Sequence, residues 1–143
     1  MKINPSPRRR RGFTLVELMV VVLIIAVLAA LVVPRVQDRL SQAKVGSARS
    51  QISRFASVLN QFRVDCDRFP TTEEGLNALL SQPSDISTWK GPYLELSTIP
   101  PDPWGFEYTY ISPGPYSEDS FSVGTNGPDG QEGTDDDITN LDL

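Results

Sequence analysis

The sequence contains no histidine and only one cysteine, Cys66, among its 143 residues. Without histidine, the chain lacks the commonest general base and the commonest metal ligand, so most hydrolase triads and most zinc sites are excluded. A single cysteine also excludes an intramolecular disulfide and any cysteine-rich metal site. The length allows one ordinary domain, or a small domain with an appended segment.

Basic residues are missing from the C-terminal part of the chain. Five of the 13 Lys and Arg residues lie within the first 12 positions, whereas residues 118–143 contain eight acids and no base. An acidic body repels the phosphates that supply most non-specific affinity for nucleic acids, so we expect no nucleic-acid partner. An acidic C-terminus is either a solvated run or a site for a hard cation.

Apolar residues are concentrated near the N-terminus. Residues 1–12 are short, polar and basic, and residues 13–33 are almost wholly apolar. As a helix, this run spans about 31 Å, the thickness of a bilayer core, so we expect a transmembrane segment. The basic cluster would keep the N-terminus in the cytoplasm and place the rest of the chain in the periplasm. A secretory signal peptide is the alternative, but no A-x-A cleavage site follows the run.

One carboxylate, Glu17, interrupts the apolar run. A charged side chain costs about 2.5–3.5 kcal/mol at the centre of a membrane helix, and less near the interface. Glu17 is therefore either an interfacial residue or a carboxylate that awaits a positive partner.

The leader and the apolar run together carry a resemblance. RRRRG followed by FTLVE, the apolar helix and Pro34 resembles the class III leader of type IV pilins and type II secretion pseudopilins. The resemblance implies that a prepilin peptidase cuts after Gly12 and methylates the new amino group of Phe13. It also implies that Glu17 pairs with the N-terminal amine of a neighbouring subunit in a filament. Such pairing would offset the high cost of burying a lone charge.

A second helical pattern follows Pro34. Apolar residues recur at spacings of three and four, which is typical of an amphipathic helix with one buried face. These residues are Val45, Ala48, Ile52, Phe55, Leu59, Phe62 and Cys66. We predict one long helix from Phe13 to about Arg63, kinked near Pro34, with its second half supporting a globular head. Cys66 belongs to the stripe, so a buried structural thiol is expected.

The remaining elements are short. Thr71 and Glu74 have the spacing of a capping box, which predicts a short helix with Leu76, Leu79 and Leu80 on its apolar face. Residues 106–111 and 120–123 alternate like strands.

The order of motifs in this region resembles that of the major (G-type) pseudopilins of type II secretion systems. The motifs are FPTTEEGLNALL, WKGPYL and PPDPWGFEYTY, and the resemblance covers nearly the whole chain after residue 8. The single cysteine differs from the two that close a C-terminal loop in type IVa pilins. The implied fold is α+β and type IV pilin-like. Its long N-terminal helix, membrane half plus amphipathic half, packs on a small antiparallel sheet with a C-terminal calcium loop.

Residues 126–138 form the segment with the most evident chemistry. Carboxylate and carbonyl oxygens are dense there, and three glycines let the backbone fold tightly. Calcium takes 6–8 oxygen ligands, although the spacing is not that of an EF-hand. From the residues alone, the segment is either a solvated acidic turn or a calcium site.

The resemblance to major pseudopilins implies that this segment binds one calcium ion. Two backbone carbonyls and three carboxylates would supply ligands, with Glu132 and Asp135 as alternative carboxylates. The implied ligands are the carbonyls of Asn126 and Thr134 and the carboxylates of Asp129, Asp136 and Asp137.

The sequence as a whole is interpreted as a membrane-anchored structural subunit with no catalytic constellation, and therefore not an enzyme. Residues 1–12 would be a cleaved leader, 13–33 a transmembrane and filament-core helix, and 34–143 the periplasmic helix and head. The subunit would polymerise into a periplasmic pseudopilus that drives folded proteins across the outer membrane. Its partners would be copies of itself, the prepilin peptidase and N-methyltransferase, minor pseudopilins and an inner-membrane assembly platform.

Two alternatives remain at this point. One is a type IV pilin or competence pseudopilin for adhesion, motility or DNA uptake. The other is a stand-alone calcium-binding module, secreted or lipid-anchored, with residues 1–30 as an ordinary signal.

Overall fold

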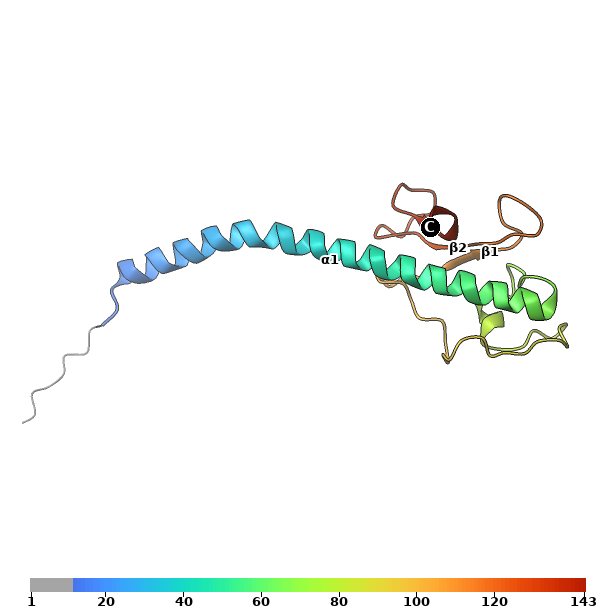
Figure 1. Cartoon of the computed structure of the whole chain (residues 1–143). Coiled ribbons are helices and arrows are strands. Elements are labelled where there is room, and N and C mark those ends of the chain that lie inside the picture. The colour runs from blue at the N-terminus through green and yellow to red at the C-terminus, as the bar shows by residue number, and fades with distance from the viewer. Residues whose placement is uncertain (1–11) are drawn as a thin grey trace, which may run out of the picture. The chain divides into compact units, whose positions relative to one another are not determined.

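The computed structural model describes residues 12–143, except for the side chains of residues 31–36. A long helix is followed by a head of short elements (Figure 1). These elements are α1 (Leu15–Cys66), the 3₁₀ helix η1 (Gly75–Leu79), β1 (Thr109–Ile111), β2 (Ser122–Thr125), β3 (Ile138–Thr139) and the 3₁₀ helix η2 (Asn140–Asp142). The chain divides into two compact units, of which the first ends at Leu40 and the second spans Ser41–Leu143.

The long helix α1 confirms the prediction of one continuous helix in place of two separate ones. It ends where Asp67 adopts a positive φ of 58° and its N–H bonds the carbonyl of Arg63 at 2.8 Å. A residue in this left-handed conformation commonly terminates a helix. The kink predicted near Pro34 falls among residues 31–36, whose side chains lie outside the described part of the structure.

The apolar stripe of α1 forms the centre of the hydrophobic core in the second unit. Five of its residues have no exposed surface, while Val45 and Cys66 at its two ends are only partly buried. The five are Ala48, Ile52, Phe55, Leu59 and Phe62. Aromatic rings from the head pack on them; the ring of Phe55 meets that of Tyr108 edge-on at 5.0 Å between centroids. The stripe therefore organises the head, as its spacing predicts.

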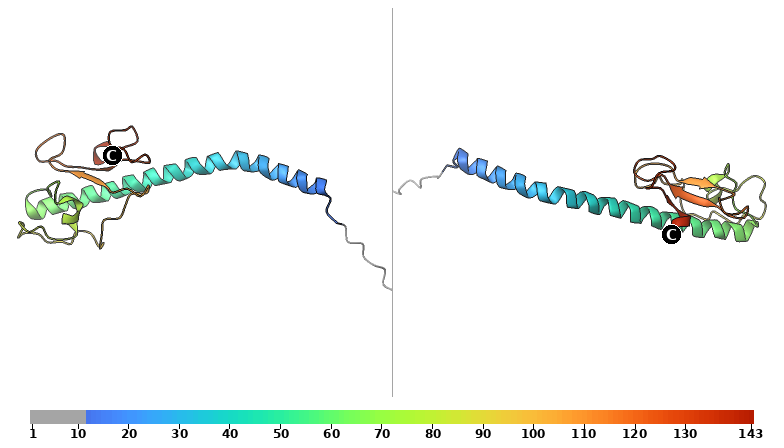
Figure 2. Two further views of the ribbon diagram at one scale, coloured as in Figure 1. Left: turned by 180° about the vertical axis from the view of Figure 1, so that it is seen from behind. Right: turned by 90° about the horizontal axis from the view of Figure 1, so that it is seen from above.

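The sheet has the strand order β1-β2-β3 and is antiparallel throughout. Tyr110 pairs with Val123 across β1 and β2, and Thr125 pairs with Ile138 across β2 and β3. The first two strands overlap the predicted ranges, 106–111 and 120–123, but β1 begins three residues later than predicted and β2 is displaced by two residues toward the C-terminus. The third strand was not predicted, because a strand of two residues leaves no alternation to detect. Figures 1 and 2 show the sheet alongside the last turns of α1.

The short helix predicted after Thr71 is a 3₁₀ helix, and it begins only at Gly75. The predicted capping box is present, since Glu74 accepts the Thr71 N–H at 2.7 Å while the Thr71 hydroxyl accepts the Glu74 N–H at 3.2 Å. It closes a turn that precedes η1 instead of starting an α-helix. Arg68 holds Glu74 from the other side at 2.8 Å, and this hydrogen bond lowers the pKa of the Glu74 carboxyl.

Candidate functional site

The predicted processing residues open the described part of the chain. Gly12 and Phe13 precede α1, and the Phe13 side chain is 84% exposed. A Cβ added to Gly12 would meet no atom within 4 Å, so the fold of the chain itself does not require glycine there. Any requirement for a small residue at position 12 would therefore have to come from another molecule that contacts this part of the chain.

Glu17 lies in the first turn of α1, where it makes a capping box with Thr14. Its carboxylate accepts the N–H of Thr14 at 3.0 Å and the hydroxyl at 3.1 Å. The Thr14 hydroxyl accepts the Glu17 N–H in return, at 3.2 Å. The T-x-x-E spacing that signals this motif is visible in the sequence, although the capping box was not among the predicted features. Glu17 therefore also stabilises the start of the helix.

The N-terminal part of α1 is a continuous apolar surface. Its large apolar side chains from Leu15 to Leu28 are 47–76% exposed. Contiguous apolar patches of this size mark contact with lipid or with another protein. No helix among the described residues combines the length and the apolar character needed to cross a membrane. The predicted segment spans residues 13–33, and the side chains of its last three residues, 31–33, lie outside the described part of the structure.

The acidic loop, residues 126–137, connects β2 to β3. The pairing of Thr125 with Ile138 closes its base. Gly127 has a φ of +65°, and a Cβ there would lie 2.5 Å from the Asp136 carbonyl oxygen and 2.6 Å from its Oδ2. The two ends of the loop thus approach more closely than any side chain at position 127 would allow.

Three carboxylates of the acidic loop converge on one hydroxyl group. The Thr134 hydroxyl donates to Oδ1 of Asp136 at 2.7 Å. It also lies 3.4 Å from Oδ1 of Asp129 and 3.4 Å from Oδ1 of Asp137. These are the three residues predicted as carboxylate ligands, and the fold has brought them together. The Thr134 hydroxyl at their centre was missed, since only its carbonyl was considered.

These three carboxylates lack a cationic partner. None of them takes part in an ion pair among the described residues. The hydrogen bond from the Thr134 hydroxyl lowers the pKa of the Asp136 carboxyl below its usual value, so this carboxylate is charged at neutral pH. Within residues 12–143, no three His, Cys, Asp or Glu side chains form a group that could hold a metal by themselves. A cation here would need further oxygens, from the hydroxyl or the backbone.

The other predicted ligands are placed less clearly. The Thr134 carbonyl accepts the Asp137 N–H at 3.3 Å, which leaves it one lone pair for another partner. Asn126 is half-buried at the end of β2. Glu132 and Asp135 are exposed, and neither carboxylate accepts a hydrogen bond from the Thr134 hydroxyl.

A buried carboxylate joins the turn before β1 to the end of β2, next to the acidic loop. One oxygen of Asp102 accepts the N–H groups of Trp104, Gly105 and Phe106 at 2.8–2.9 Å, and the other accepts the hydroxyl of Thr125. Four donors thus satisfy this carboxylate without a counter-charge. Asp102 was not among the predicted residues, although an Asp at the start of D-P-W-G is a signal for such a turn.

Residues 35–141 match the family described as type II secretion system (T2SS), protein G, and residues 7–33 match the prokaryotic N-terminal methylation motif. The chain belongs to the type II secretion system protein G family. The match to protein G, residues 35–141, covers nearly all of the second compact unit and the six helical residues before it.

Curated relatives agree with this assignment. The chain is 42% identical over 140 residues to the type II secretion system core protein G of Pseudomonas aeruginosa, covering 94% of this chain and 97% of the relative. It is 43% identical over 136 residues to the core protein G of Dickeya chrysanthemi, covering 93% and 87%. The crystal structure of the major pseudopilin of the type 2 secretion system of enterohaemorrhagic Escherichia coli superposes with a TM-score of 0.63 at 34% identity. That match covers 78% of this chain and 98% of the other.

The family confirms several predictions from the sequence. The protein is a pseudopilin, a structural subunit of a type II secretion system, and not an enzyme. The comparisons do not favour a type IV pilin or a competence pseudopilin. The long helix on a small antiparallel sheet is the pilin-like fold that the motifs predict.

Proposed function

We propose that the protein is inserted into the bacterial inner membrane, cut after Gly12, and assembled with copies of itself into a periplasmic pseudopilus. Residues 13–33 would serve first as a single membrane anchor and then as the filament core. The observation that carries this proposal is the apolar surface of α1 from Leu15 to Leu28, which is exposed in the isolated chain. A lipid bilayer and a bundle of like helices both cover such a surface.

Processing would create the group that Glu17 needs. A prepilin peptidase that removes residues 1–12 would free the amine of Phe13 and then methylate it. The match of residues 7–33 to the N-terminal methylation motif supports processing by such an enzyme. In a filament, the Glu17 carboxylate of one copy would pair with the amine of a neighbour. Assembly would also involve minor pseudopilins and an inner-membrane platform, with Arg8–Arg11 keeping the leader on the cytoplasmic side.

The acidic loop would bind one calcium ion in this proposal. The carboxylates of Asp129, Asp136 and Asp137 would hold it, together with the carbonyls of Asn126 and Thr134. Their convergence on the Thr134 hydroxyl, without a cationic partner among the described residues, supports this assignment. A bound ion would offset three clustered negative charges, and so hold β2 and β3 together.

Mass spectrometry of the N-terminus tests the core of the proposal. In cells with a type II secretion system, the mature chain should begin at N-methylated Phe13. Gly12→Val should leave the full-length precursor in the membrane and stop secretion, whereas the matched small variant Gly12→Ala should still be cut. A mature chain that begins elsewhere, or normal processing of Gly12→Val, would contradict the assignment.

A further inference from the structure

The charges of the chain are segregated between the helix and the head. Residues 35–54 contain five bases and only one acid, Asp38, whereas residues 55–143 contain three bases and sixteen acids. The five bases of the helix are Arg35, Arg39, Lys44, Arg49 and Arg54. A basic stalk and an acidic head within one chain are complementary surfaces for two copies of that chain.

All basic residues at positions 55–143 are already in ion pairs. The three basic residues among positions 55–143, of which Arg63 lies in the last turn of α1, all form ion pairs with acids of the same range. These pairs are Arg63 with Asp119, Arg68 with Glu74 and Asp85, and Lys90 with Asp65. The other acids of the head form no ion pair among the described residues. Any further positive charge for these acids has to come from outside residues 55–143.

Of the bases on the helix within the second unit, Arg54 is the most available. Lys44 is half-buried. The pKa of Asp142 is lowered mainly by hydrogen bonds from Thr139, and in part by the nearby charge of Arg49. Arg54 is exposed and makes no ion pair among the described residues, although its neighbours Ile52 and Phe55 are buried. Because successive helix residues turn by about 100°, Arg54 is presented away from the core of its own chain.

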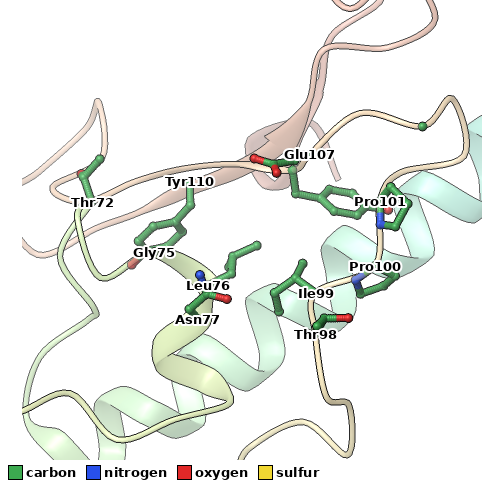
Figure 3. Close-up of a pocket in the computed structure, with 12 residues that line it drawn as sticks. Thr72, Gly75, Leu76, Asn77, Thr98, Ile99, Pro100, Pro101, Glu107 and Tyr110 are labelled. Atoms are coloured by element: carbon green, nitrogen blue, oxygen red, sulfur yellow. The ribbon is translucent and has the colours of Figure 1, made fainter.

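The head contains a hollow suited to a guanidinium group. It has a volume of about 570 Å³ and lies between η1, residues 98–101 and the start of β1. Figure 3 shows Leu76 and Ile99 pointing into it, the ring of Tyr110 on one side and the carboxylate of Glu107 at the rim. Glu107 is the one acid among the lining residues, and it has no ion pair in the described structure. Arginine suits such a site because its planar group both bonds a carboxylate and stacks on an aromatic ring.

We propose that this hollow receives the Arg54 side chain of a second copy, which pairs with Glu107 at its rim. Each copy carries one Arg54 and one hollow, and these lie on different surfaces of the chain, so the contact between two copies is head-to-tail. Contacts of this kind produce an open filament when the rotation between copies does not close a ring. The proposal rests on the proposed self-assembly, and it specifies a contact outside the apolar helix core.

Charge exchange in the full-length protein tests the contact. Glu107→Arg and Arg54→Glu should each reduce the yield of pseudopili on overexpression by roughly tenfold, because each change places like charges in the contact. The double variant, Glu107→Arg with Arg54→Glu, restores opposite charges and should recover most of the yield. Glu95→Arg alters an exposed head carboxylate outside the hollow, and should leave the yield close to that of the wild type.

The outcomes separate this proposal from the proposed function. If the wild-type chain forms no pseudopili, the proposed function fails. If the wild type assembles and the double variant, processed and protease-resistant, does not recover, the contact is wrong. If Glu107→Arg abolishes secretion yet leaves pseudopili intact, the hollow binds an exported protein and the second-copy contact is overturned.

Discussion

The two halves of α1 are built on opposite principles. From Leu15 to Leu28 nearly every residue is apolar and the side chains are exposed all round, whereas from Ala48 to Phe62 apolar residues form one stripe that is completely buried. A helix that is apolar on all faces must be covered by lipid or by like helices, because no single partner in the chain could bury it. A striped helix needs only one partner, and the head supplies it. The first half of α1 therefore presents its apolar surface to other molecules, whereas the second half buries its apolar stripe against the head of the same chain.

The largest effect should come from the charge at the start of this first half of α1. Glu17→Leu removes both the carboxylate and the capping box, whereas Glu17→Gln preserves the capping pattern and removes only the charge. Both variants should be inserted and cut normally, and both should lose nearly all pseudopili in a pelleting assay. Thr14→Ala weakens only the cap, and should assemble. If Glu17→Gln assembles like the wild type, then capping is the role of Glu17 and the proposed pairing with Phe13 is wrong.

A core substitution should separate the two halves by stability. Phe62→Ala empties a fully buried site, and should lower the free energy of unfolding of the head by about 3–5 kcal/mol. Val22→Ala, in the exposed half, should change it by less than about 0.5 kcal/mol. Denaturant unfolding of the purified chain in detergent, followed by tryptophan fluorescence, measures both. Equal losses would mean that the two halves unfold as one unit.

Calcium should sharpen the contrast further, because the proposed calcium site lies in the head. Saturating calcium, at about 100 times the dissociation constant, should stabilise the head by about 2.7 kcal/mol. Asp137→Ala should remove most of the shift in thermal midpoint and Asp129→Ala much of it, whereas Glu118→Ala, outside the acidic loop, should preserve it. Magnesium should act more weakly, since it requires stricter octahedral geometry.

Two observations would argue against the calcium site. A chelator without effect on the thermal midpoint would mean that the acidic loop is only a solvated turn. Magnesium as effective as calcium would mean that the converging carboxylates attract cations without selecting among them.

The smallest effect concerns the ion pair beside η1. Arg68 lowers the pKa of Glu74 from its usual 4.5, so the pair contributes stability that is fully present above pH 4.5 and is lost as the pH falls through the lowered value. Glu74→Gln should cost about 1 kcal/mol at pH 7, and little near pH 3. Urea titrations of both proteins at the two pH values measure this difference. A loss that does not shrink in acid would show that Glu74 acts by packing.

Some of the head could be read from the sequence, and some could not. A strand of two residues has no alternation to detect, which is why β3 was missed, and the short strand β1 was predicted to start three residues early. The 3₁₀ helix η2 was missed because three residues are too few to show a helical period. Spacings of three and four over five turns leave little ambiguity, so the stripe of α1 was predicted correctly. Asp102 is an intermediate case: its turn has a local signal, but its bond to Thr125 joins residues distant in sequence.

By itself, the sequence determined the long helix, its division into an apolar and a striped half, the predicted processing residues and the position of the acidic loop. These features depend on interactions within a few residues, or on the solvent alone. Only the tertiary structure decided that Asp129, Asp136 and Asp137 converge on the Thr134 hydroxyl. It also decided that Glu107 lies at the rim of a hollow whose lining contains no Lys or Arg. Such arrangements depend on how β2 and β3 pair and how loops close on α1, and those pairings bring together residues that local spacing does not relate.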